Sequence, residues 1–194
     1  MHAGVVAAAL RPFLGERSLI LLDGPEHMRM RKLMLPPFHG ERMHAYGRQM
    51  VECTHASVDA WPRGEEFPIH QPMQRVTLDV ILRTVFGIDE EGPRERLGAL
   101  LEELLDLAAW PGLLIPAMQR DLGPWSPWGR FARRAERASD VLIDEIERRR
   151  REGTAGRVDI LSMLVDARDE NGEGLSITDL RDELVTLLVA GHET

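Results

Sequence analysis

Apolar residues recur at three- and four-residue spacing along most of the chain, and proline or glycine separates one such stretch from the next. This periodicity is typical of amphipathic helices. The fold class predicted is therefore all-α. The expected helices cover residues 23–33, 41–61, 73–86, 93–109, 129–151 and 159–167, and a last one from 176 or 178 onward.

Residue types at the start of the first of these helices support its assignment. Asp23 is placed to cap the helix, Pro25 fits its first turn, and Glu26 follows three residues after Asp23, as in a capping box. Pro36 and Pro37 cannot continue the helix and are expected to end it.

The segment from Trp110 to Trp128 interrupts the helical pattern. It contains four prolines and all but one of the tryptophans. Such a segment is too apolar for a solvated linker. We expect a loop or broken helix that packs on the rest of the protein or covers a pocket.

Composition limits the class of protein. The chain has 194 residues, a formal net charge of −8 and a single cysteine. This length fits one domain, and the acidic balance argues against a general nucleic-acid binder. One cysteine excludes an internal disulfide framework and a four-cysteine zinc site. No apolar run is long enough to span a bilayer, so we expect a cytoplasmic protein without a membrane anchor.

Several common sites are absent from the sequence, which contains neither a phosphate-binding loop nor a nucleophile elbow. His39 and His44 are five residues apart, a spacing that does not place a metal-binding pair on one helix face. Cys53 lies on the apolar face of its helix and is interpreted as a core residue. The arginine run 148–151 is interpreted as solvated, at a helix end where cations suit the dipole.

His27 and Arg31 form the first group of residues that could bind a ligand. At four-residue spacing they project from one helix face. Together they could bind a carboxylate or phosphate through charge-assisted hydrogen bonds. The alternative is an ordinary solvated surface pair.

The second constellation ends the sequence, as Ala190-Gly191-His192-Glu193-Thr194. A glycine inside a leucine-rich helix costs about 1 kcal/mol relative to alanine and requires a reason. Thr186, Ala190 and Thr194 form a stripe of small or hydroxyl-bearing residues beside which a flat ligand could approach the backbone, with Glu193 next to it. The alternative is close packing of another helix at Ala190 and Gly191.

These residues resemble one family. The segment 190–194, after its leucine- and valine-rich helix, is similar to the oxygen-binding motif of cytochrome P-450 monooxygenases, and 23–31 resembles the segment that holds the haem propionates in bacterial-type members. Segments 78–87 and 159–179 resemble further parts of the same family, in the same order. The resemblance implies an incomplete portion of the multihelical cytochrome P-450 fold, with residues 1–194 as a single partial domain.

The resemblance also implies roles for the first constellation and for part of the second. His27 and Arg31 would hydrogen-bond and neutralise the haem propionates. Ala190 and Gly191 would pack over the distal face of the haem, where their lack of bulk leaves room for dioxygen.

The remaining implied roles concern catalysis and the substrate. Thr194 would hydrogen-bond bound oxygen or a nearby water, and Glu193 would belong to the proton-delivery route. Thr186 and Val189 are weaker candidates for lining the substrate cavity.

The implied function is insertion of one oxygen atom of O2 into a small organic substrate, using haem b and electrons from NAD(P)H through a ferredoxin or reductase. The sequence lacks the family's proximal cysteine loop and its Glu-x-x-Arg helix at the expected place. We therefore expect the iron ligand, a thiolate, to come from a missing C-terminal part, and no metal ligand in this chain. The isolated chain is predicted to be inactive. The alternative function is a stand-alone helical binding or scaffold module.

Overall fold

The computed structural model describes residues 10–115 and 118–192. Helices and turns make up this part of the chain, apart from one isolated antiparallel bridge between Arg168 and Gly174. The all-α prediction is confirmed. The helices are α2 (Arg11–Leu14), α3 (Gly24–Met34), α4 (Glu41–Asp59), α5 (His70–Thr84), α6 (Glu91–Ala108), α7 (Pro127–Glu152), α8 (Ile160–Asp166) and α9 (Ile177–His192), with short 3-10 turns η2 (Pro36–Phe38) and η3 (Pro111–Leu114).

A side-chain cap marks the start of α7, α8 and α9, whereas α2 to α6 start without one. Ser126 caps α7 by accepting a hydrogen bond from the Gly129 N–H at 3.0 Å, which starts this helix two residues before the predicted position. Asp23 occupies the N-cap position of α3 as predicted, although its side chain accepts no capping hydrogen bond. The segment between η3 and α7 is irregular where the structure describes it, which confirms the predicted interruption.

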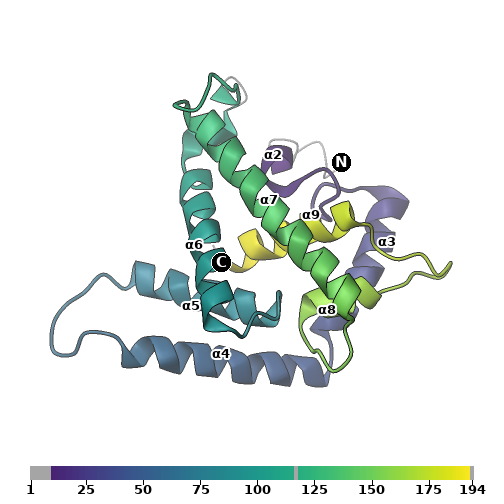
Figure 1. Ribbon diagram of the computed structural model, residues 1–194, viewed down its shortest axis with the longest axis horizontal. Coiled ribbons are helices and arrows are strands. Elements are labelled where there is room, and N and C mark those ends of the chain that lie inside the picture. The colour runs from purple at the N-terminus through teal and green to yellow at the C-terminus, as the bar shows by residue number, and fades with distance from the viewer. Residues whose placement is uncertain (1–9, 116–117, 193–194) are drawn as a thin grey trace.

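The helices pack around α9, which runs through the middle of the molecule (Figure 1). α7 crosses α9, α6 lies beside α7, and α4 pairs with α5 below them (Figure 1). One apolar core joins these helices, and its innermost side chains are fully inaccessible: Phe86, Leu101, Leu161, Leu164, Leu180 and Leu184. Complete burial of each such side chain is worth about 1.5–3 kcal/mol, so the core fixes how the helices lie around α9.

Arg149 departs from the predicted solvated run, because its side chain is 0 % exposed. Its guanidinium donates to Asp159 Oδ1 at 2.5 Å, to the Phe86 carbonyl at 2.8 Å and to Glu145 Oε1 at 2.9 Å. It also donates to the Ser162 hydroxyl. The prediction was wrong at this position because the chain just after α5 and the start of α8 pack against the end of α7 and surround the guanidinium with acceptors.

Cys53 is buried in α4 with 2 % exposure, which confirms its interpretation as a core residue. Burial raises the pKa of its thiol to about 11, so the thiol stays protonated. In the described part of the chain, no helix is long and apolar enough to cross a membrane.

Candidate functional site

The N-terminal end of α9 is fixed by a reciprocal cap. The Asp179 N–H donates to Ser176 Oγ at 3.0 Å, and the Ser176 N–H donates to Asp179 Oδ2 at 3.0 Å. Each residue therefore satisfies a backbone donor of the other. The predicted start near Ser176 is confirmed.

Beyond this cap, one face of α9 carries buried polar side chains. Asp182 and Glu183 are 0 % exposed and Thr186 is 7 % exposed. With Asp179 they occupy positions i, i+3, i+4 and i+7, which place them on one side of the helix. The chain segment 15–20, which we call the strap, packs against this face.

Hydrogen bonds hold the strap to α9 at successive residues. The Arg17 N–H donates to Asp182 Oδ2 at 2.8 Å, and the Leu19 N–H donates to Glu183 Oε1 at 2.6 Å. Between them, the hydroxyls of Ser18 and Thr186 share a hydrogen bond of 2.7 Å. The strap therefore satisfies its buried backbone N–H groups with side chains of α9 instead of with a strand or helix of its own.

Gly15 shows how closely the strap approaches α9. Its φ is +83°, and a Cβ at this position would lie 2.2 Å from Asp182 Cγ. A larger residue would clash with the carboxylate and would be strained at this φ.

The three carboxyl groups on this face titrate differently. Burial raises the pKa of Glu183 to about 7, and burial also raises the pKa of Asp182. Burial opposes ionisation of Asp179 as well, but hydrogen bonds from Arg17 and Ser176 outweigh it and lower the pKa of that group. Asp179 therefore binds the partly exposed guanidinium of Arg17 in the strap. Glu183 binds the backbone N–H of Leu19 in the strap, and burial opposes its ionisation.

An apolar cavity of about 520 Å³ lies between α2, α6, α7 and α9. Its size is ordinary for a small-molecule site. Thr186, Val189 and Ala190 line it from α9, and Leu14, Gly15 and Ile20 line it from α2 and the strap. Most of the remaining lining is aliphatic or aromatic, including Leu101, Leu105, Phe131 and Leu142. The arrangement suits a small apolar molecule lying along α9.

The last described turn of α9 is open on one side. Ala190 and Gly191 are exposed, whereas His192 is buried, with its Nδ1 3.4 Å from Thr77 Oγ1. A Cβ added at Gly191 would lie 3.1 Å from Ile81 Cδ1 of α5. Close packing against α5 is thus one reason for this glycine. Glu193 and Thr194 lie outside the described residues.

His27 and Arg31 share α3, with His27 half-buried and Arg31 exposed. Neither side chain makes an ion pair or hydrogen bond within the described ranges. Their neighbours do: Arg29 Nε lies 2.6 Å from Asp169 Oδ2, and Lys32 Nζ lies 2.7 Å from Glu170 Oε1. Arg29 and Lys32 of α3 are therefore paired with acids in the turn after α8. The side-chain donors of His27 and Arg31 remain available to a ligand.

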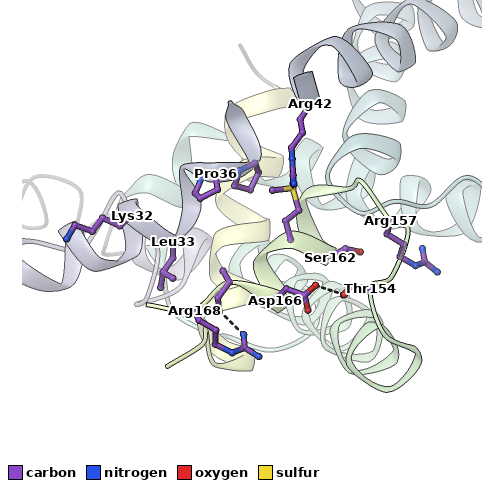
Figure 2. A pocket seen from close by; sticks show the side chains of 12 residues that line it. Lys32, Leu33, Pro36, Arg42, Thr154, Arg157, Ser162, Asp166 and Arg168 are labelled. Atoms are coloured by element: carbon purple, nitrogen blue, oxygen red, sulfur yellow. Dashed lines mark hydrogen bonds between the residues drawn. The ribbon is translucent and has the colours of Figure 1, made fainter. Parts of the chain in front are cut away.

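A second cleft, of about 390 Å³, lies between the end of α3 and α8 (Figure 2). Although it is lined by four cations, they do not converge on one point: Lys32 pairs with Glu170, and Arg168 donates to the carbonyls of Val165 and Ala167. Figure 2 shows Arg157 turned away from the cleft. We assign it no ligand.

No cluster of three or more His, Cys, Asp or Glu side chains suited to a metal ion occurs in the described part of the chain. The kind of site therefore has to be identified from the fold and from the family to which the chain belongs. The family model that matches this sequence is that of cytochrome P-450, over residues 5–194.

This chain belongs to the cytochrome P-450 family. Cytochrome P-450 135B1 of Mycobacterium tuberculosis is 37 % identical over 196 residues, which cover 100 % of this chain and 41 % of that relative. Cytochrome P-450 137 of the same species is 38 % identical, covering 93 % of this chain and 38 % of its own length. The chain therefore spans about two fifths of the length of the curated relatives it matches.

The fold comparison gives the same family. The retinoic acid-bound cyanobacterial protein CYP120A1 superposes with a TM-score of 0.79 at 25 % identity, covering 96 % of this chain and 40 % of that structure. The predicted all-α cytochrome P-450 architecture is confirmed by this match.

Membership of the cytochrome P-450 family implies a haem cofactor, and the residues present fit one. The available donors of His27 and Arg31 suit the anionic propionates. Ala190 presents little bulk at the open end of α9, where a flat macrocycle needs room, whereas the missing side chain of Gly191 faces Ile81 of α5. The structure leaves the specific roles of these residues as predictions.

The contacts between the strap and α9 are not apparent from the local sequence pattern. A signal was present, since two adjacent acids, Asp182 and Glu183, interrupt the apolar pattern of a central helix. Buried acids of this kind require partners, but the partners lie more than 160 positions away in the sequence.

Proposed function

We propose that this chain forms the distal part of the active site of a haem-dependent monooxygenase. The observation that supports it best is the apolar cavity along α9, which reaches Ala190 of the Ala-Gly-His-Glu-Thr motif. Residues 1–194 would form part of a single cytochrome P-450 domain. The proximal thiolate would come from a part of the protein outside this chain. Family membership gives the alternative of a scaffold module no support.

The proposed reaction converts a C–H bond of a small organic substrate to C–OH. One atom of O2 enters the product and the other leaves as water, which consumes two electrons and two protons. The electrons would come from NAD(P)H through a ferredoxin or reductase. Haem b, when bound, would supply the iron at which dioxygen is activated.

His27 and Arg31 would bind the propionate groups of the haem and so fix its position. Both can donate charge-assisted hydrogen bonds to carboxylates, and the guanidinium can do so with two N–H groups at once. Since neither has an acidic partner within the described residues, binding a propionate would not require an existing ion pair to break.

The C-terminal turn of α9, with the residues that follow it, would provide space for dioxygen and deliver protons to it. Ala190 and Gly191 would leave space for dioxygen beside the helix, where a bulkier residue would fill it. The Thr194 hydroxyl would hold dioxygen or a water by a hydrogen bond, and the Glu193 carboxyl would pass on protons from solvent.

Thr186 and Val189 would form the wall of the substrate site. Both line the cavity. Because the Thr186 hydroxyl already bonds to Ser18, this residue would present its methyl group rather than its hydroxyl to an apolar substrate.

A carbon monoxide difference spectrum tests the proposal in two samples. The haem-loaded protein that carries this chain should give a thiolate-type Soret band. The isolated 194-residue chain, reconstituted with haem, should not, because Cys53 is buried in the core with a raised pKa. The lack of such a band in the first sample would refute the proposed function, and a band in the second would refute the assignment of the ligand to another part of the protein.

A further inference from the structure

α3 carries cations on two of its sides. His27 and Arg31 are four residues apart and share one side. Arg29 is two residues from each of them, which turns its side chain by roughly 200° about the helix axis. Its guanidinium contacts the turn 169–174 between α8 and α9 (Figure 1). α3 is therefore attached to the protein on the side opposite to the candidate propionate donors.

Arg29 binds both ends of this turn. Its Nε donates to Asp169 Oδ2 at 2.6 Å, and its Nη2 donates to the carbonyl of Gly174 at 3.2 Å. The side chains of Arg29 and Asp169 are 34 % and 13 % exposed, so water competes with this ion pair less than with a fully exposed one. Two contacts from one planar guanidinium also fix its orientation, which a single contact would not.

Hydrogen bonds within the turn close it on itself. Asp169 Oδ1 accepts the backbone N–H groups of Asn171 at 2.9 Å and Glu173 at 3.0 Å, and the Asp169 N–H donates to the Glu173 carbonyl at 2.9 Å. The guanidinium of Arg29 and these N–H groups lower the pKa of Asp169, so this group is a carboxylate at neutral pH. One carboxylate therefore both shapes the turn and binds α3.

The turn leads directly into α9. Leu175 follows Gly174 and is buried, and its carbonyl accepts a hydrogen bond from Arg150 Nη2 of α7 at 2.7 Å. Ser176 then forms the cap of α9. Arg29 therefore links the position of α3 to the start of the helix that ends in the Ala-Gly-His-Glu-Thr motif.

Two further ion pairs join α3 to the described part of the chain, and both are more exposed. Lys32 Nζ lies 2.7 Å from Glu170 Oε1, with side chains 65 % and 81 % exposed, and Arg17 Nη1 lies 3.6 Å from Glu26 Oε2. Exposed ion pairs contribute little, because water and salt screen them. The contact of Arg29 is therefore the one best suited to fix α3.

We propose that Arg29 is a positioning residue for the haem: its contacts with the turn fix α3 relative to α9 and so bring His27 and Arg31 to the propionates. This inference rests on the proposed role of His27 and Arg31. Apolar burial of α3 is non-directional, whereas hydrogen bonds require defined distances and angles. Arg29 itself does not touch the haem, since it projects from the opposite side of the helix.

Haem loss to an apo-globin acceptor, measured on the haem-loaded protein that carries this chain, tests the proposal. We expect Arg29→Gln to speed the loss about fivefold, because α3 then lacks the charge-assisted hydrogen bonds that fix it. Asp169→Asn removes the same ion pair from the other side and should act in the same direction. Lys32→Gln is the matched control. It removes an exposed ion pair between the same helix and the same turn, and should change the rate less than about twofold.

A double-mutant cycle with Arg31 separates positioning from a general loss of stability. If Arg29 acts by placing Arg31, then Arg31→Gln should speed haem loss less in the Arg29→Gln background than in the unsubstituted protein. A role in stability alone would leave the two factors multiplicative. The same cycle with Asp169→Asn provides the answer if Arg29→Gln does not fold, because asparagine keeps an acceptor for the N–H groups of the turn.

Multiplicative factors in the cycle of either variant, or an Arg29→Gln rate no greater than that of Lys32→Gln, would overturn the inference. An Arg31→Gln variant that loses haem no faster than Arg48→Gln would refute the propionate contact of Arg31, and this inference with it. A protein with a thiolate-type carbon monoxide band and multiplicative factors refutes this inference alone. A protein without the band refutes the proposed function.

Discussion

Replacing Glu183 with glutamine tests whether the buried carboxylate weakens the fold when it is ionised. Burial raises the pKa of this group from 4.5 to about 7. The folded state therefore binds the proton more tightly than the unfolded chain does. It follows that the free energy of unfolding falls as the pH rises through the interval between these two pKa values, and levels off above it.

The size of the effect follows from the same two pKa values. One pKa unit corresponds to 1.36 kcal/mol, so the full penalty at about pH 8 amounts to about 3 kcal/mol. Glutamine keeps an oxygen that can accept the Leu19 N–H, at 2.6 Å from Glu183 Oε1 in the structure, and carries no charge. Its amide NH2 would take the place of Oε2, which is buried without a hydrogen-bond partner among the described residues, and this offsets part of the gain.

We expect Glu183→Gln to raise the free energy of unfolding by about 1–3 kcal/mol at about pH 8 and to change it little at about pH 5. Urea unfolding followed by far-ultraviolet circular dichroism at both pH values measures this difference. Glu173→Gln is the matched control, since Glu173 is exposed. A Glu183→Gln variant that is less stable than the unsubstituted protein at about pH 8 would show that the ionised carboxylate stabilises the strap, contrary to the reasoning above.

Two further predictions concern the buried arginine and the proposed haem contacts. Arg149→Ala should lower the free energy of unfolding by about 3–5 kcal/mol, because it leaves the Asp159 carboxylate buried without its guanidinium; chemical denaturation measures the loss, and Arg151→Ala, at an exposed position, should cost far less. Arg31→Gln should speed haem loss from the haem-loaded protein about tenfold, as measured by transfer to an apo-globin acceptor, because charge-assisted hydrogen bonds to a propionate are lost. Arg48→Gln, an exposed arginine of α4, is its control, and equal rates in the two variants would exclude a propionate contact for Arg31.

The helices were predictable because their signals are local. Leu180, Leu184 and Leu188 of α9 recur at four-residue spacing and are all nearly inaccessible in the structure. Ser126 and Ser176 lie at helix starts where a hydroxyl can accept a backbone N–H. Such contacts reach only three residues along the chain, so the sequence displays them directly.

The candidate site was predictable only in part. Its motif residues His27, Arg31, Ala190 and Gly191 could be singled out by residue type and spacing, and their proposed roles remain to be tested by the experiments above. The cavity could not, because two of the helices that line it, α2 and α9, lie more than 160 positions apart in the sequence and come together only through packing.

The sequence by itself determined that this protein is helical, where most of its helices lie, and which family it resembles, since periodicity, caps and short motifs are all properties of neighbouring residues. Only the tertiary structure decided that Arg149 is buried rather than solvated, and that Asp182 and Glu183 bind the backbone of the strap. The physical reason is that a charged side chain can be buried only where partners surround it. In this protein the strap groups that bind Asp182 and Glu183, and the Phe86 carbonyl that binds Arg149, come from segments that are distant in sequence and adjacent only after folding.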